Sequence, residues 1–364
     1  MKGHLVLADI SGYTRFLTES ELEHANGIIS DLLNAVIASI QAPLTLSSIE
    51  GDAVFLYGSM PEDVQGQTVI ESVESLYGAF AGALETMVLN TTCQCNACVN
   101  INTLGMKIVM HCGEYVTSQI GGRETLSGPD VIVAHRLLKN HIIESTGIAD
   151  YMLVTQPCVD ELGIENMVAA WTEHTEEYEH VGEIQGYVSS LSELWEFLRR
   201  QNENKVLQGD AWISMSTFSE ASPAVVWDHQ TDPLKRKEWM EVAGVTTHAV
   251  SHGRIGPGSE YHCAHGDGET QVFTVLDMKP VDYITFMVPL GDGIAMRYTD
   301  YVIPSGSGTR LVSYIAPLFS IETGEVLAEE TLERMKDSMT GRNSAGYARL
   351  AEMANEAASR LTSV

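Results

Sequence analysis

Leu5-Val6-Leu7-Ala8-Asp9-Ile10-Ser11-Gly12 is the stretch that decides the fold of the first half of this chain, together with Ile49-Glu50-Gly51-Asp52-Ala53-Val54-Phe55 further along. Each is a short apolar run that carries an aspartate next to a turn, which predicts two strands. An aspartate at such a position is often only a turn former. Two carboxylates on neighbouring strands can instead converge on one divalent cation, as a metal-bound nucleoside triphosphate requires.

These two stretches resemble the metal-binding half of the class III nucleotidyl cyclase homology domain. Two later segments extend the resemblance. Lys107-Ile108-Val109-Met110-His111-Cys112-Gly113-Glu114 is similar to the central strand of that family with its HxGE ending, and Gly128–Leu137 is similar to its GxxVNxAxRL helix start. The resemblance covers residues 1 to about 195 and implies a ferredoxin-like βαββαβ domain.

The resemblance also implies roles for single residues. Asp9 and Asp52 match the metal-binding aspartates, with Ile10 beside them at the metal, and the metal would be Mg²⁺ or Mn²⁺. Arg136 matches the arginine that stabilises phosphate charge. Because the active sites of this family lie between two subunits, the resemblance further implies a homodimer.

Three positions of the nucleotide site bear on activity. Ser48 stands where active members have a purine-reading lysine, Ile132 replaces the asparagine that orients the ribose, and Thr125 falls near the second base-reading position. Losing one preorganised transition-state donor costs on the order of 10²–10³ in rate. A narrower resemblance, to a bacterial group with degenerate cyclase domains, a CxCxxC insertion and an HRLLKN segment (here His135–Asn140), favours a repurposed site.

A cysteine-rich insertion, residues 91–102, interrupts this domain. Cys93, Cys95 and Cys98 are close enough along the chain to bind one tetrahedral zinc ion, which would hold a loop that lacks apolar anchors. A loop with free thiols is the alternative. Three ligands are visible and the sequence does not identify the fourth. Cys158 or a residue of a second subunit could serve, whereas His111 and Cys112 are poor candidates unless the insertion folds back.

Composition restricts the partners and the compartment. The chain has 364 residues, 44% of them hydrophobic, and a formal net charge of −28, from 21 Lys and Arg against 49 Asp and Glu. Such a charge repels nucleic acid and anionic membranes. We expect no signal peptide, and no apolar run approaches the ~20 residues that span a bilayer. We therefore expect a cytoplasmic protein with reduced cysteines.

The remaining pattern of the first half fits an α+β sheet. Ser20-Glu21-Leu22-Glu23 predicts a capping box before an apolar helix. Strands are expected near 44–49, 53–58 and 151–155, and helices over about 65–89 and from Val131. The cyclase-type domain is assigned to residues 1–198 and a polar linker to 199–207.

Residues 208–364 have a different pattern. A strand over 212–218, a short helix opened by Ser222-Pro223, several strands and a helical tract over about 323–361 resemble the START-like (SRPBCC) helix-grip fold of polyketide cyclases and lipid-transfer domains. Such a fold implies an apolar ligand cavity between the sheet and the last helix. A closed core is the alternative. The expected cavity residues are Trp239, Tyr261, Phe273, Phe286, Met296, Met335 and Met339.

Two functions remain open. The first is a sensor or regulatory protein in which the START-like domain binds a small apolar ligand, while the cyclase-like domain dimerises and binds a metal-nucleotide with little turnover. The second is an active, unorthodox nucleotidyl cyclase, a phosphorus-oxygen lyase that is gated by the START-like domain. Ser48 and Ile132 favour the first, because an active cyclase would need substitutes for the two missing groups.

Overall fold

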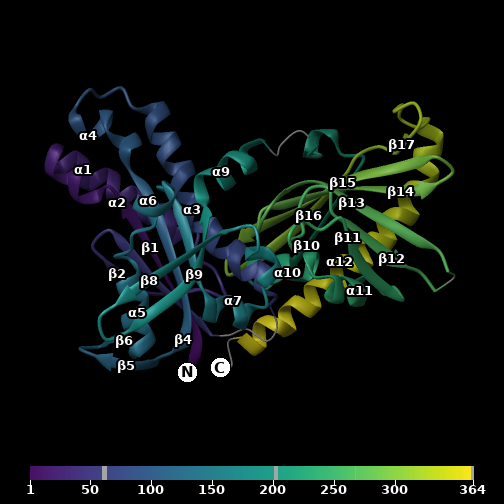
Figure 1. Ribbon diagram of the computed structural model, residues 1–364. Helices are drawn as coiled ribbons and strands as arrows, with labels where there is room; N and C mark the ends of the chain where they lie inside the picture. Colours follow the sequence, from purple (N-terminus) through teal and green to yellow (C-terminus); the bar gives the residue numbers. More distant parts are fainter. Residues whose placement is uncertain (60–63, 201–203, 267, 362–364) are drawn as a thin grey trace. The chain divides into compact units, whose positions relative to one another are not determined.

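The structure is a computed structural model that describes residues 1–59, 64–200, 204–266 and 268–361. The chain divides into two compact units, Met1–Glu62 with Val69–Phe197 and Asp63–Thr68 with Leu198–Val364. Both units contain sheets and helices (Figure 1), so the predicted α+β class is confirmed. Part of the predicted linker, residues 201–203, lies outside the described residues.

The first unit is built on one mixed sheet. Its strand order is β2-β3-β1-β4-β7-β9-β8, and only the β4–β7 pair is parallel. The interior strand β1 carries the buried run Leu5–Ala8 between β3 and β4. The strands are β1 (Lys2–Ser11), β2 (Thr45–Glu50), β3 (Ala53–Ser59), β4 (Gly105–Glu114), β7 (Tyr151–Thr155), β8 (Thr172–Tyr178) and β9 (Gly182–Ser190), with a separate hairpin β5 (Val116–Ile120) and β6 (Arg123–Ser127).

Helices connect these strands. Helix α2 buries the residues whose spacing predicted its apolar face, Ile29, Leu32, Leu33 and Val36. The helices of this part of the chain are α1 (Tyr13–Glu19), α2 (Leu22–Ala38), α3 (Gly66–Asn90), α4 (Asn96–Val99), α5 (Pro129–Leu137), α6 (Ile142–Thr146), α7 (Gln156–Leu162), α8 (Glu165–Val168) and α9 (Leu191–Arg200).

The predicted capping box of α2 is wrong. The residue that caps the helix is Glu21, and its side chain makes no capping hydrogen bond. Its carboxylate instead accepts hydrogen bonds from the backbone N–H groups of Asn96 and Ala97, at 3.2 and 3.1 Å. The side chain of the capping residue therefore contacts a segment far along the chain and not its own helix.

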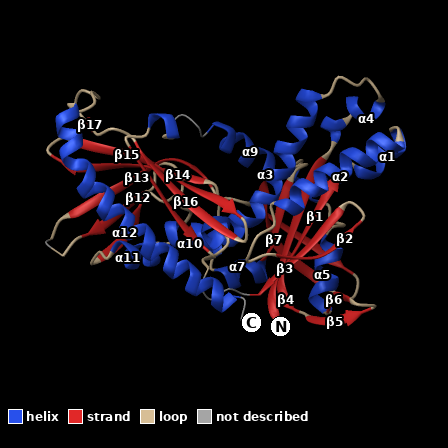
Figure 2. Ribbon diagram, turned by 180° about the vertical axis from the view of Figure 1, so that it is seen from behind, coloured by secondary structure: helices blue, strands red, loops and turns tan. Residues whose placement is uncertain are grey.

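The second unit is an antiparallel sheet with a long helix against it. The strand order is β10-β16-β15-β14-β13-β12-β11, and β17 pairs with β15. Helix α12 contacts β10, α10 and α11, and Figure 2 shows it as the long blue helix beside the red strands. The elements are β10 (Ile213–Ser219), α10 (Pro223–Thr231), α11 (Pro233–Met240), β11 (Gly244–His248), β12 (Glu260–Ala264), β13 (Thr270–Lys279), β14 (Tyr283–Gly291), β15 (Ile294–Ser305), β16 (Gly308–Ile315), β17 (Phe319–Ser320) and α12 (Glu329–Leu361).

The sequence predicted where two helices of this unit begin, and only one of these predictions is correct. Ser222 caps α10 as expected, since its side chain accepts a hydrogen bond from the Val225 N–H. Helix α12 begins at Glu329 and not near residue 323. The residues before it form a turn, in which the Leu327 N–H donates to the Leu318 carbonyl at 2.9 Å.

The expectation of six reduced cysteines is also wrong for this structure. Cys112 of β4 and Cys158 of α7 form a disulfide, with their Cα atoms 4.7 Å apart. Packing of α7 against β4 brings the two residues together, although 46 positions separate them in the sequence.

In the described part of the chain, no helix is long and apolar enough to cross a membrane.

Candidate functional site

The two predicted metal-binding aspartates lie at the same end of β1. Asp9 stands opposite Ala53 of β3 on one side and Lys107 of β4 on the other. Asp52 is in the turn before β3, and its carbonyl accepts a hydrogen bond from the Ile10 N–H at 3.2 Å. Burial raises the pKa of the Asp52 carboxyl, and the negative charge of Asp9 raises it further.

The carboxylate of Asp9 already forms an ion pair with Lys107. The Lys107 Nζ lies 3.0 Å from Asp9 Oδ2, and it also donates to the Leu138 carbonyl at 3.1 Å. The Asp9 and Lys107 side chains are only 15% and 22% exposed, so solvent screens this pair less than an ion pair on the open surface. A divalent cation would have to compete with this ammonium group for Asp9.

The other predicted nucleotide-site residues separate into two groups. Ser48 and Thr125 line one open surface cavity of ≈ 780 Å³ between β2 and β6. In that cavity Ser48 Oγ donates to Glu50 Oε1 at 2.9 Å, and His135 Nε2 lies 3.0 Å from the other oxygen of Glu50.

The second group does not line this cavity. Ile132 is 56% exposed on α5. The Arg136 guanidinium donates to the Glu179 backbone carbonyl at 2.9 Å, so the turn between β8 and β9 already holds it. The side chain of Ile10 is buried in the core, which leaves its backbone as the only polar part that could meet a metal.

A Cys₃His cluster lies at the start of α2. His24 joins Cys93, Cys95 and Cys98, and the four ligand atoms all lie within 4.8 Å of one another. His24 Nδ1 is 3.2 Å from the sulfur of Cys95 and 3.9 Å from the sulfurs of Cys93 and Cys98. Metal–ligand bonds of about 2.1–2.3 Å in a tetrahedron place ligand atoms about 3.5–3.8 Å apart. The donor set and its spacing fit zinc.

The fold of the insertion explains this convergence. Cys95 caps the short helix α4, which carries Cys98, and Glu21 of α2 accepts the N–H groups at the start of α4. Because His24 is the fourth member of the cluster, neither Cys158 nor a residue of a second subunit is needed as a ligand. Cys158 is also engaged in the disulfide. His24 was missed because 69 positions separate it from Cys93 and no local pattern marks it.

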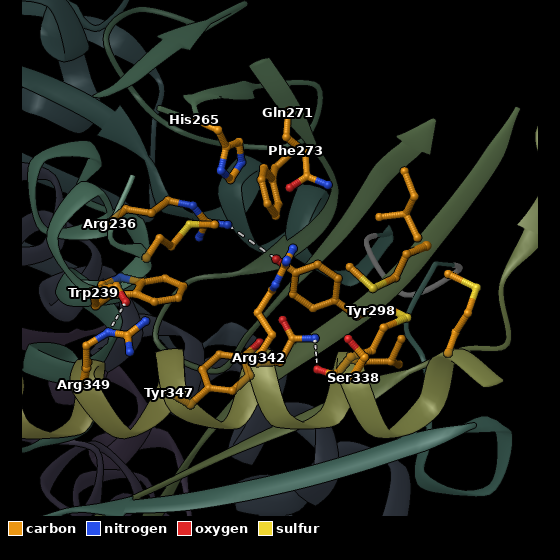
Figure 3. Close-up of a pocket in the computed structure, with 17 residues that line it drawn as sticks. Arg236, Trp239, His265, Gln271, Phe273, Tyr298, Ser338, Arg342, Tyr347 and Arg349 are labelled. Atoms are coloured by element: carbon orange, nitrogen blue, oxygen red, sulfur yellow. Dashed lines mark hydrogen bonds between the residues drawn. The ribbon is translucent and has the colours of Figure 1, made fainter. Parts of the chain in front are cut away.

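The second unit contains a cavity of ≈ 330 Å³ under α12 (Figure 3). This volume lies within the range of about 300–1,000 Å³ typical of small-molecule sites. Five of the seven predicted cavity residues line it, namely Trp239, Phe273, Met296, Met335 and Met339. Tyr261 and Phe286 are fully buried behind the wall, with their ring centroids 6.0 Å apart.

Sequence reasoning missed the polar part of this cavity. Arg236, Arg342 and Arg349 line it along with the apolar residues, and so does His265. Arg236 lies in the charged run Lys235–Glu238, which gives no signal that one of its members is buried. Its relative exposure is nevertheless 0%.

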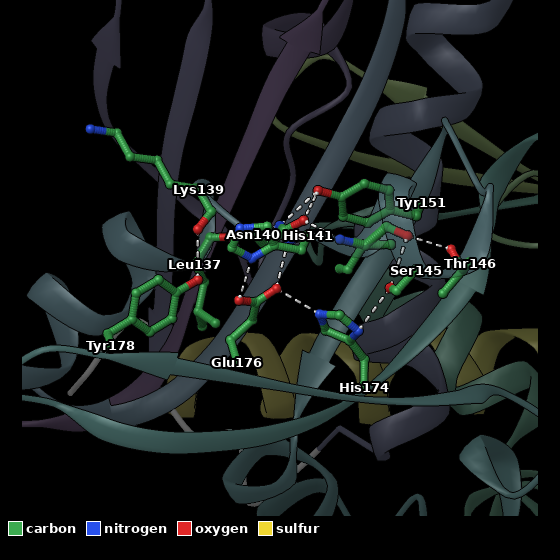
Figure 4. A network of polar contacts seen from close by, with 11 residues as sticks. Leu137, Lys139, Asn140, His141, Ser145, Thr146, Tyr151, His174, Glu176 and Tyr178 are labelled. Atoms are coloured by element: carbon green, nitrogen blue, oxygen red, sulfur yellow. Dashed lines mark hydrogen bonds and ion pairs between the residues drawn. The ribbon is translucent and has the colours of Figure 1, made fainter.

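A further polar network holds the segment after α5 (Figure 4). The buried carboxylate of Glu176 accepts hydrogen bonds from the backbone N–H of His141, at 2.6 Å, and from the rings of His141 and His174, at 3.1 and 2.8 Å. Burial opposes the ionisation of Glu176, but these hydrogen bonds together keep its pKa below the usual value. The arrangement is that of a structural tie between β8 and the loop before α6.

Comparisons with known proteins give low similarity. Residues 29–146 match a family described as "Protein of unknown function (DUF2652)". The chain is similar to "Uncharacterized protein Rv2561/Rv2562" of Mycobacterium tuberculosis, with 26% identity over 167 residues, which are 45% of this chain and 74% of that protein.

Among solved structures, cyclases are neighbours at low sequence identity. A bacterial light-regulated adenylyl cyclase has a TM-score of 0.39 and 15% identity, over 55% of this chain and 57% of that one. The guanylyl cyclase Cya2 has a TM-score of 0.41 and 16% identity, over 52% of this chain and 92% of that one. This chain thus spans little more than half the length of the light-regulated enzyme.

Proposed function

We propose that this protein is a ligand-responsive regulatory protein. The second unit is a START-like domain that binds a small, largely apolar molecule, and the first unit is a cyclase-type domain that responds without efficient turnover. The observation that carries the proposal is the cavity of ≈ 330 Å³ under α12, with aromatic and methionine side chains in its wall. Methionine side chains adapt to irregular apolar shapes, which suits a binding cavity.

Three contacts in the first unit support weak turnover. Lys107 is paired with Asp9, Arg136 is bonded to the Glu179 carbonyl, and Ser48 is bonded to Glu50. Each group would have to leave a partner within the protein before it could serve a metal-nucleotide. Binding of Mg²⁺ or Mn²⁺ with a nucleotide, and dimerisation through this unit, are the parts of the proposal that rest on the sequence resemblance alone.

The Cys₃His cluster has a structural part in this proposal. A zinc ion there would join the insertion to the first turn of α2, where Glu21 already receives two backbone hydrogen bonds from α4. Four protein ligands leave no open position for a substrate, which is typical of structural zinc.

A neutral apolar fluorophore tests the ligand site. N-phenyl-1-naphthylamine should bind the full-length protein with a rise in fluorescence, and Met339→Trp should abolish this because it fills the cavity. Asp337→Trp is the matched control, since this exposed residue of α12 does not line the cavity. Equal fluorescence from both variants, or none from the wild type, would refute an apolar ligand site.

The alternative, an active nucleotidyl cyclase, is supported by the two aspartates at one end of β1. Their mutual repulsion, which adds to burial in raising the pKa of Asp52, is what a bound divalent cation would relieve. Incubation with ATP or GTP and Mn²⁺ separates the two functions. Cyclic product that disappears in Asp52→Ala would make the protein an enzyme and would replace the regulatory proposal.

A further inference from the structure

A fully buried arginine forms part of the cavity wall. Arg236 of α11 has a relative exposure of 0%. Its guanidinium carbon lies 4.8–5.2 Å from the ring centroids of Trp239, Tyr261, Phe273 and Phe286. Aromatic faces attract a cation, but they do not accept hydrogen bonds as a carboxylate does. Among the described residues, no carboxylate lies within ion-pair distance of this guanidinium.

The hydrogen bonds of Arg236 are few and long. Its Nη1 donates to the Gln230 carbonyl at 3.2 Å and its Nη2 to the Tyr298 hydroxyl at 3.4 Å. Its Nε is buried and has no hydrogen-bond partner in the described part of the chain. A guanidinium has five N–H donors, and a buried charge without a counter-ion is costly. Arg236 therefore has donor capacity left for a molecule in the cavity.

The nearest buried acid does not fill this role. Asp300 accepts hydrogen bonds from the Tyr347 hydroxyl, at 2.7 Å, and from the Gln230 side-chain amide. Complete burial raises its pKa to about 6, even though the charge of Arg236 acts in the opposite direction. Asp300 is thus committed to other donors.

A second arginine points into the same cavity. Arg342 extends from α12 away from the helix and into the cavity (Figure 3), and no partner of its side chain is found among the described residues. Arg349 differs, because its Nε donates to the Trp239 carbonyl at 2.9 Å and its Nη2 lies 3.3 Å from Glu241 Oε2. Arg236 and Arg342 therefore have N–H donors available for a ligand, whereas Arg349 does not have all of its donors free.

The charge of the cavity is opposite to that of the chain. The whole protein has 49 acidic and 21 basic residues, yet the described wall of this cavity contains three arginines and no aspartate or glutamate. A neutral apolar ligand would leave the buried Arg236 without a counter-ion, whereas Arg342 is exposed and can be hydrated. An acidic group on the ligand would satisfy both, because guanidinium groups bind carboxylates through paired hydrogen bonds.

We propose that the ligand of the second unit is an anionic amphiphile, a small carboxylic acid whose carboxylate is bound by Arg236 and Arg342 and whose apolar body packs on Phe273, Met296 and Met335. This rests on the proposed function, since it specifies the chemical class of the ligand of that same site. In this proposal, Arg236 and Arg342 contact the ligand directly and take no part in a reaction.

Two probes of equal chain length test the inference. Decanoate and 1-decanol are titrated separately into the full-length protein by calorimetry at pH 8 and 0.15 M salt, which limits the effect of the overall negative charge. We expect decanoate to bind at least roughly tenfold more tightly than decanol. Arg342→Gln should remove this preference and leave decanol binding unchanged, whereas Arg342→Lys should retain part of it.

Arg334→Gln is the matched control, because it removes one positive charge from an exposed position of the same helix outside the cavity. It should change neither affinity. Equal binding of decanoate and decanol to the wild type, or an equal effect of Arg342→Gln on both probes, would overturn the anionic ligand while the apolar site stands. If neither probe binds, the proposed ligand-binding function itself fails.

Discussion

Acidification should destabilise the first unit through a single buried histidine. His4 lies on β1 between Gly58 of β3 and Cys112 of β4, is fully buried, and has no hydrogen-bond partner for either ring nitrogen among the described residues. Burial lowers its pKa from 6.5 to about 4, because the charged ring would lose its hydration without any compensation. The folded state therefore excludes a proton that the unfolded state binds.

The size of the effect follows from the two pKa values of His4. A group whose pKa is lower in the folded state stabilises the fold above the unfolded pKa, here 6.5, and this stability is lost as the pH falls toward the folded pKa near 4. Between pH 8 and pH 5 the unfolded ring becomes protonated while the folded ring stays neutral. The loss is about 1.5 pH units at about 1.36 kcal/mol each, or roughly 2 kcal/mol.

Urea unfolding of the full-length protein, followed by circular dichroism at pH 8 and pH 5, measures this loss. His4→Gln cannot titrate, so it should show about 2 kcal/mol less destabilisation on acidification than the wild type, whatever its own stability at pH 8. Burial also lowers the pKa of His111, but His111 is present in both proteins, so its contribution cancels in the comparison. The same pH dependence in wild type and variant would refute the reasoning.

Two further predictions concern the cations of the first unit. Mass spectrometry should detect one zinc ion per wild-type chain. Cys98→Ser should lose this ion because it removes one of four ligands, whereas Cys263→Ala, at a buried cysteine outside the cluster, should keep it. Zinc-free wild type, or equal zinc in both variants, would contradict the site. Lys107→Met should strengthen Mn²⁺ binding to the zinc-loaded protein at least about tenfold by calorimetry, since Asp9 loses the ammonium group that lies 3.0 Å away. Lys139→Met, at an exposed lysine, should leave the Mn²⁺ affinity unchanged. An unchanged affinity in Lys107→Met would show that Lys107 does not compete with a metal.

Local patterns in the sequence predicted most of the elements that carry the first unit. The run Leu5–Ala8 predicted the buried strand β1, and the segment around Glu50-Gly51-Asp52 predicted the turn between β2 and β3. Both predictions depend on neighbouring residues only, which is why they could be made without the fold. The capping box at Ser20 depended on neighbours as well, and it failed because Glu21, not Ser20, occupies the N-cap position of α2.

The zinc cluster likewise combines ligands that the sequence predicted with one that only the fold identified. Spacing alone identified Cys93, Cys95 and Cys98 as potential ligands of one metal, because residues so close in sequence can reach a common point. Only the packing of α4 on α2 identified His24, which no sequence interval connects to them. The pairing of Cys112 with Cys158 likewise required β4 and α7 to be in contact.

By itself, the sequence determined that the chain forms two α+β parts, that a cysteine triplet interrupts the first, and that the second has enough large apolar side chains to line a cavity. Only the tertiary structure decided which charges those apolar surfaces would enclose. Lys107 at Asp9 and Arg236 in the cavity wall both come from segments whose local patterns do not distinguish a buried cation from an exposed one. The physical reason is that hydrophobic periodicity reports which face of an element is buried, whereas the partner of a charged group depends on the elements packed against it.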